Sequence, residues 1–126
     1  MITIKGMNID FNLTSPSDMR RLYEARERAD KRKAEVETKA PTDAAAPDYL
    51  TQYVDWLNAL LNIYGNFIDD AFGEGMAEKL LTNNPSLDRV LDVNDELEAA
   101  LGVHVQAITA RFGRYKPNRA AMREKQ

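Results

Sequence analysis

The side chains best able to do chemistry in this sequence are its clustered carboxylates. Asp69 and Asp70 are adjacent, and four more acidic residues lie between positions 92 and 98. Paired carboxylates can act as general acid and base, or hold Mg²⁺ or Ca²⁺. However, neighbouring side chains on a helix point about 100° apart, and no matching second cluster or ligand loop is visible. We therefore expect a solvated acidic face. The second cluster consists of Asp92, Asp95, Glu96 and Glu98.

A pair of glycines raises a second chemical possibility, a phosphate-binding loop. Gly73 and Gly75 lie in the stretch FGEGMAEKLL. A phosphate loop joins a strand to a helix and usually places a lysine at the helix start. Here the flanking patterns are both helical, and Glu74 between the glycines would repel phosphate. We expect a corner between two helices.

The single histidine does not indicate a catalytic site. His104 lies between Val103 and Val105 at the edge of an apolar stripe, and no motif places a nucleophile near it. Asn94 interrupts the same stripe, where it either satisfies a buried polar partner or sets the helix register.

The chain has no cysteine, which excludes disulfides and thiolate chemistry and fits a reducing cytoplasm. The sequence predicts no catalytic or metal-binding residue, no cofactor and no enzymatic activity.

The charges are segregated along the chain and point to contacts with other molecules. Residues 41–112 carry 12 acidic and 3 basic side chains, whereas residues 113–126 carry 5 basic and 1 acidic. The basic groups of the first helix and of the tail are either solvated or bind a partner. A nucleic-acid partner is not expected, because such proteins more often carry a basic stripe on the folded body. An acidic protein surface, including that of a second copy of the chain, is the alternative partner. The candidate partner-binding residues are Arg26, Arg28, Lys31, Arg32, Arg114, Lys116, Arg119 and Arg123.

The first thirteen residues predict a β-hairpin. A two-residue turn at Lys5-Gly6 places Ile4 opposite Met7 and Ile2 opposite Ile9, so that both strands share one apolar face. Gly6 can supply the positive φ of such a turn. An isolated hairpin is marginal in water, so we expect helices to cover this face.

The remaining elements are helices with recognisable starts and stops. Ser15 and Pro16 begin a highly charged helix whose apolar face ends after Tyr23; its extension is either solvated or an arm that meets another molecule. Segment 38–47 reads as a mobile linker. A wide apolar arc over 53–72, with Asp48 as its cap, predicts a central helix. A short piece and a last helix capped by Ser86 and closed by Gly113 follow.

We therefore predict an α+β, mostly helical fold, in which an N-terminal β-hairpin packs on a bundle of three to four helices. Residues 1–112 form one domain and residues 113–126 a basic tail. No apolar run approaches the roughly 18 residues of a membrane span. The predicted core is Ile2, Ile4, Ile9, Phe11, Leu22, Tyr53, Leu57, Leu60, Tyr64, Ile68, Leu91, Leu97, Leu101, Val105 and Ile108.

The order of these pieces carries a family resemblance. The start MITIKGMNIDFNL, the capped charged helix, and DDAFGEGMAEKLL (Asp69 to Leu81) followed by another helix resemble a small uncharacterised bacteriophage protein family from phages of Gram-positive bacteria. The matching pieces are residues 1–24 and 64–101. In length and layout the chain is similar to tail assembly chaperones of long-tailed phages.

The resemblance implies a non-enzymatic role in the cytoplasm of the infected bacterial host. Such chaperones coat the tape-measure protein and help recruit tail-tube subunits, which requires an amphipathic grip on a helical client and self-association along it. The expected partners are thus the tape-measure or tail-tube protein, with a homo-oligomer as a further alternative. The competing interpretation is a phage-encoded inhibitor of a host defence or replication protein, whose acidic surface mimics nucleic acid.

Overall fold

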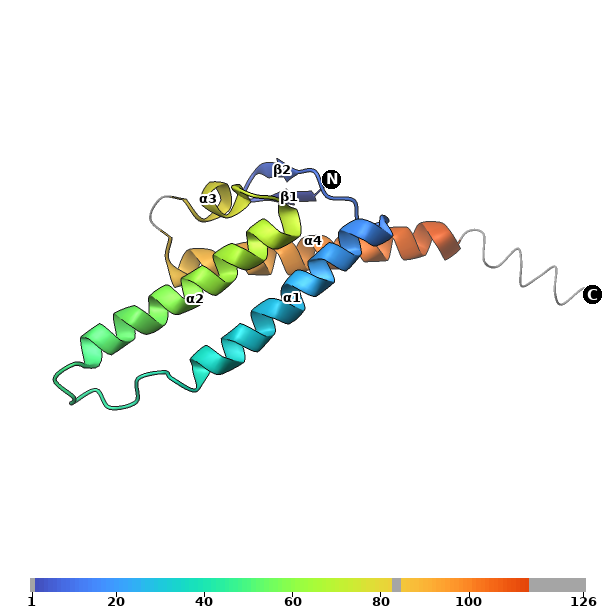
Figure 1. Ribbon diagram of the computed structural model, residues 1–126. Helices are drawn as coiled ribbons and strands as arrows, with labels where there is room; N and C mark the ends of the chain where they lie inside the picture. Colours follow the sequence, from blue (N-terminus) through green and yellow to red (C-terminus); the bar gives the residue numbers. More distant parts are fainter. Residues whose placement is uncertain (1, 83–84, 114–126) are drawn as a thin grey trace, which may run out of the picture.

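The computed structural model describes residues 2–82 and 85–113 of the chain (Figure 1). It has the predicted α+β, mostly helical fold: a two-stranded N-terminal hairpin packed with four helices. The hairpin and the short helix α3 lie together on one side, and α4 runs behind the other helices (Figure 1). The elements are β1 (Ile2–Ile4), β2 (Met7–Ile9), α1 (Pro16–Glu37), α2 (Tyr49–Phe72), α3 (Met76–Leu81) and α4 (Leu87–Gly113).

The hairpin has the register that its sequence predicts. Ile2 pairs with Ile9 and Ile4 with Met7 in an antiparallel ladder. Both turn residues have positive φ, 51° at Lys5 and 75° at Gly6, as a two-residue hairpin turn of this hand requires. The shared apolar face is buried, and β1 packs on α4.

The helix α1 begins at the predicted cap and continues along α2. The backbone N–H of Asp18 donates to Ser15 Oγ at 3.5 Å, and Pro16 is the first helical residue. After Leu22 the contact with α2 continues through small side chains, since Ala25 is buried and Ala29 packs against the core. Arg21 Nε also donates to the Ala71 carbonyl of α2 at 3.0 Å. The charged part of α1 is therefore one side of an antiparallel helix pair and exposes only its outer face.

The glycine stretch is a corner between helices, as predicted. Gly73 ends α2 with φ 119°, and Gly75 precedes α3 with φ 88°. Asp69 Oδ1 accepts the backbone N–H of Ala77 at 2.8 Å, which satisfies a free donor in the first turn of α3. The chain reverses here because both glycines adopt backbone angles that are costly for other residues.

Two further caps were predicted. Ser86 Oγ accepts the Arg89 N–H at 3.2 Å, which confirms the cap of α4. Asp48 precedes α2, but the prediction that it caps the helix is wrong: its carboxylate instead accepts from the Gln52 side chain at 2.8 Å. The φ of −99° and ψ of 14° at Asp48 differ from the extended backbone that a side-chain cap needs.

Most of the predicted core is buried, but α4 is rotated about its axis from the expected orientation. Leu91 and Val105 are exposed, whereas Val90 and Val93 are buried with Leu97. The predicted row runs through Leu91, one position after Val90 of the buried row. The buried row is the one that meets α2 and the hairpin. Tyr53 is also exposed, because α4 does not reach the beginning of α2. Leu57, Tyr64, Leu101 and Ile108 are half-buried.

Turns connect α1 to α2. The basic tail lies outside the described residues. In the 38–47 segment, Lys39 and Ala46 donate backbone hydrogen bonds to Val36 and Asp43; the mobility of this segment stays a prediction. Arg114, Lys116, Arg119 and Arg123 fall in the part of the chain that the structure does not describe. No helix within the described ranges is both long and apolar enough to span a membrane.

Candidate protein-binding surface

The candidate basic residues of α1 divide into two groups. Arg26 forms an ion pair with Glu98 of α4, and Arg28 Nη2 lies 3.4 Å from Asp70 Oδ2 of α2. These two guanidinium groups connect α1 to its neighbours. Lys31 and Arg32 lie on the exposed outer face of α1. A role of any of the four in partner binding stays a prediction.

The acidic clusters are spread over contacts with different elements and do not converge. Asp69 bonds to the backbone of α3, and Asp70 pairs with Arg28. The ammonium of Lys5, in the hairpin turn, lies 3.7 Å from Asp92 Oδ2 and 3.5 Å from Glu96 Oε2. Over the described ranges no group of three or more acidic or histidine side chains could hold a metal ion. These carboxylates fasten elements to one another.

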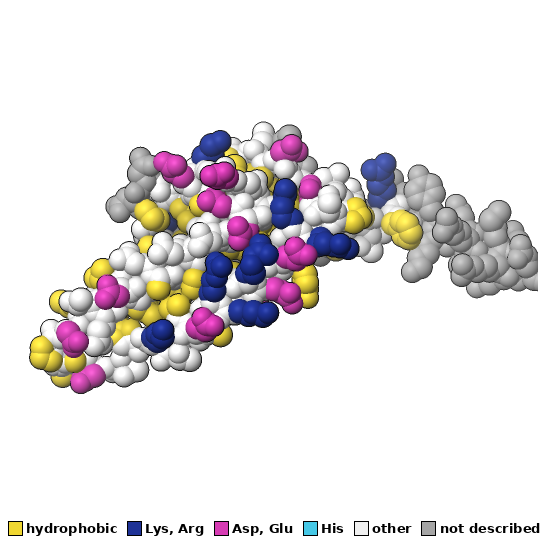
Figure 2. Space-filling model, viewed as in Figure 1, with side chains coloured by type: hydrophobic (Ala, Val, Ile, Leu, Met, Phe, Trp, Pro, Cys, Tyr) yellow, Lys and Arg dark blue, Asp and Glu magenta, His cyan; other side chains and the backbone are white. Residues whose placement is uncertain are grey.

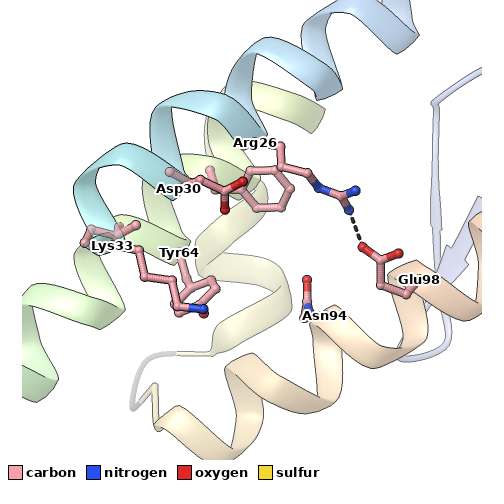
Figure 3. Close-up of a pocket in the computed structure, with 9 residues that line it drawn as sticks. Arg26, Asp30, Lys33, Tyr64, Asn94 and Glu98 are labelled. Carbon is pink, nitrogen blue, oxygen red and sulfur yellow. Dashed lines mark hydrogen bonds and ion pairs between the residues drawn. The ribbon is translucent and has the colours of Figure 1, made fainter. Parts of the chain in front are cut away.

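A groove lies where α1, α2 and α4 meet, and Figure 3 shows its lining. Its cavity has a volume of about 240 Å³. Ala29, Ile63 and Phe67 contribute apolar surface, while Asp30 and Lys33 of α1 contribute charge. The remaining lining residues are Arg26, Tyr64, Asn94 and Glu98. Because Arg26 and Glu98 are ion-paired with each other, the groove is mixed in character and favours neither an anion nor a cation.

The tyrosine across this groove affects the pKa of Lys33. The pKa of the Lys33 ammonium is raised above its ordinary value of 10.5, chiefly because the Tyr64 side chain attracts the ammonium electrostatically and accepts a hydrogen bond from it. Glu37 and Asp30 raise the pKa further, while partial burial lowers it. Lys33 is therefore a cation at neutral pH and points toward Tyr64 (Figure 3).

Beyond this groove α2 exposes an apolar row. The row consists of Leu50, Val54, Leu57 and Leu61, which recur at steps of four, three and four. Leu50 is 74% exposed and Val54 52%, while Leu57 and Leu61 are half-buried. In Figure 2, hydrophobic side chains gather over the end of the α1–α2 pair where α2 begins. The neighbouring Tyr53 is 39% exposed and stacks with Tyr49 at 6.3 Å between ring centroids.

The apolar row of α2 continues into the core. Ile68 and Phe72, further along the same side of the helix, line an apolar space together with Val90 and Val93 of α4. The fourth helix thus covers the second half of this helix side and leaves the first half open. Residues 49–68 contain a single charged side chain, Asp55. An apolar arc that is wider than one contact can cover normally packs on two sides, so the open half is suited to receive another helix.

Leu50 and Val54 were missing from the predicted binding residues. The sequence does carry a signal, namely the scarcity of charge over 49–68. The wide apolar arc predicts a helix covered along its whole length, and this holds only for the second half of α2. Which half of α2 is covered depends on where α4 crosses it, and that position is set by tertiary packing.

The fold and this surface define a small, mostly helical α+β protein with an open apolar helix face. Residues 5–126 match a family of unknown function (DUF6673), and the chain belongs to that family. No curated protein and no solved structure matches the chain.

Proposed function

We propose that this protein is a non-enzymatic binding protein that holds a helical segment of a partner protein against the open face of α2. The observation that carries the proposal is the apolar row of α2, whose second half is covered by α4 and whose first half is open. A partner helix laid along the first half would continue the packing that α4 begins. It would remove Leu50 and Val54, 74% and 52% exposed, from water.

The chemistry of the surface supports a particular kind of segment. An amphipathic helix that docks in an apolar groove uses anchors at i, i+3 or i+4, and i+7, and the apolar row of α2 has the matching spacing. The groove with Asp30 and Lys33 lies on another side of α2 and includes none of the four residues of the row. The preferred segment is therefore apolar on the face that meets the row.

The resemblance to tail assembly chaperones supplies the biological setting. In that setting the partner is the tape-measure protein of a long-tailed phage, and the site of action is the host cytoplasm. A long helical client exposes apolar faces before the tail tube surrounds it, and exposed apolar surface promotes aggregation. A small protein that covers such faces and later yields them to tail-tube subunits would fill this role.

The inhibitor alternative depends on a free acidic surface that imitates nucleic acid. Several of the relevant carboxylates face basic groups of the same chain: Lys5 lies beside Asp92 and Glu96, and Arg28 beside Asp70. These pairs reduce the negative potential that such mimicry requires. We therefore favour the chaperone, and the experiment below separates the two.

The test is co-expression with the tape-measure protein encoded nearby, followed by co-purification at low salt. We expect the wild-type chain to retain the tape-measure protein and the Leu50→Glu, Val54→Glu double variant to lose it. The matched control is Asn62→Glu with Asn66→Glu, which adds two charges at the same spacing on exposed polar positions of α2. Absence of the tape-measure protein from the wild-type eluate, together with capture of a host protein from infected cells, would favour the inhibitor.

A further inference from the structure

The last turns of α4 carry a second apolar row, separate from that of α2. Leu101, Val105, Ile108 and Phe112 recur at steps of four, three and four. Val105 is 52% and Phe112 62% exposed, and Leu101 and Ile108 are half-buried. In Figure 1 this end of α4 projects beyond the hairpin and the other helices. Leu101 also packs against the core, so the row is open from Val105 onward, where the helix leaves the body.

The projecting segment has little charge that would keep it in water by itself. Between Ala99 and Gly113 the sequence holds Arg111 as its one formally charged residue. Steps of four and three are the spacing with which helices pack side chains as knobs into holes. A segment with this spacing and so few charges matches another segment of the same kind, and the same segment in a second copy meets that requirement.

We propose that α4 pairs with α4 of a second copy, antiparallel, through Leu101, Val105, Ile108 and Phe112. In this register Leu101 lies opposite the partner's Phe112, and Val105 lies opposite the partner's Ile108. The contact runs over about 16.5 Å, eleven steps along the helix at a rise of about 1.5 Å each. The proposal rests on α4 and on the charge of the sequence that follows it, and does not depend on the proposed function of α2.

Charge selects the second copy and the antiparallel direction. The first part of α4, residues 87–98, carries five acidic side chains and one basic. Lys5 and Arg26 of the same chain pair with three of these carboxylates, which leaves a local net charge of −2. The sequence that follows α4, residues 114–126, carries five basic side chains and one acidic, a net charge of +4. Because the acidic residues precede the apolar row in the sequence and the basic residues follow it, antiparallel order matches opposite charges, whereas parallel order matches like charges. Complementary charge also fixes register and direction in such interfaces.

The first experiment measures oligomeric state by light scattering coupled to size exclusion. At roughly 100 µM chain, where a Kd of about 10 µM gives mostly dimer, we expect a mass of twice the chain's 14.3 kDa. The double variant Val105→Glu, Phe112→Glu should be a monomer with unchanged helical circular dichroism. Gln106→Glu with Ala110→Glu, two exposed positions on the opposite side of α4, should remain a dimer. A monomeric wild type, or equal masses for both variants, would overturn the proposal.

The second experiment tests the direction of pairing and needs no destabilising charge. The chain has no cysteine, so introduced thiols report only on the new positions. A mixture of Leu101→Cys and Phe112→Cys chains should form a disulfide dimer on mild oxidation. Each variant alone should not, because its two thiols would lie about 16.5 Å apart along the axis, and a disulfide requires Cα atoms within about 7 Å. Cross-linking of each variant alone and not of the mixture would overturn the antiparallel pairing.

Discussion

The rings of Phe11 and Phe72 pack edge to face, with 5.2 Å between their centroids and 74° between their planes. Phe11 follows the hairpin, and Phe72 is the last residue of α2. Both rings are buried. The contact therefore fastens the hairpin to the helical part of the fold and joins two regions 61 residues apart in the sequence.

A double-mutant cycle on this pair should show coupling. Phe11→Leu and Phe72→Leu each keep an apolar side chain but remove the ring contact. We expect the double variant to lose less stability than the sum of the single variants, by about 0.5–1.5 kcal/mol, the usual contribution of an aromatic pair. Urea unfolding measures the three free energies. Additivity to within about 0.3 kcal/mol would show that the edge-to-face geometry contributes nothing beyond burial.

Two leucines of α2 should respond differently to the same substitution. Leu60 is 5% exposed, whereas Leu50 is 74% exposed. Leu60→Asp buries a carboxylate among apolar side chains, and we expect a loss of about 4 kcal/mol or more and little folded protein. Leu50→Asp should change the unfolding free energy by about 0.5 kcal/mol or less. An unchanged melting temperature for Leu60→Asp would refute the central position of α2.

Two glycines should respond with opposite sign to alanine. Gly6 has φ 75°, and an added Cβ would meet no atom within 4 Å, so only the backbone conformation opposes Gly6→Ala. We expect a loss of about 1–2 kcal/mol. Gly102 lies inside α4, also with open space around it, and Gly102→Ala should stabilise the fold by about 0.5–1 kcal/mol. Thermal unfolding of both variants tests this, and a neutral Gly6→Ala would contradict the assigned turn.

The contact of Lys33 with Tyr64 should appear as a pH dependence at alkaline pH. The pKa of Lys33 is raised in the folded chain above its ordinary value of 10.5, chiefly by Tyr64. A pKa that is higher in the folded than in the unfolded chain stabilises the fold. The stabilisation is complete at pH values below the pKa of the unfolded chain, and it is lost as the pH rises through the pKa of the folded chain. We expect the stability difference between wild type and Lys33→Met to shrink from about pH 9 to about pH 12. The effect should be small, because the Lys33 side chain is 43% exposed and solvent screens it. A constant difference would argue against the contact.

The hairpin was the element most predictable from sequence. Alternation alone requires Ile2 to pair with Ile9 once the turn is placed at Lys5-Gly6, and a register shift of one residue would expose every apolar side chain. Local chemistry also predicted the Ser15 and Ser86 caps and the glycine corner. Each of these features is decided by residues within a few positions of one another.

The orientation of α4 was not predictable in this way. Its sequence offers two apolar rows one position apart, one through Leu91 and Val105 and one through Val90 and Val93. Periodicity supports both, and only the position of β1 and α2 decides which is buried. Similarly, no local pattern shows that α4 crosses α2 near Ile68 and leaves Leu50 open. The open surfaces, and with them the candidate function, are consequences of long-range packing.

The most direct test of the account is the affinity of the chain for the tape-measure protein, measured with the matched α2 variants. We expect Leu50→Glu with Val54→Glu to raise the Kd at least about thirtyfold, as expected for loss of interface anchors worth about 2 kcal/mol. Asn62→Glu with Asn66→Glu should leave the Kd within about threefold of wild type. Equal Kd values for the two double variants would contradict the claim that the apolar row of α2 binds the partner helix.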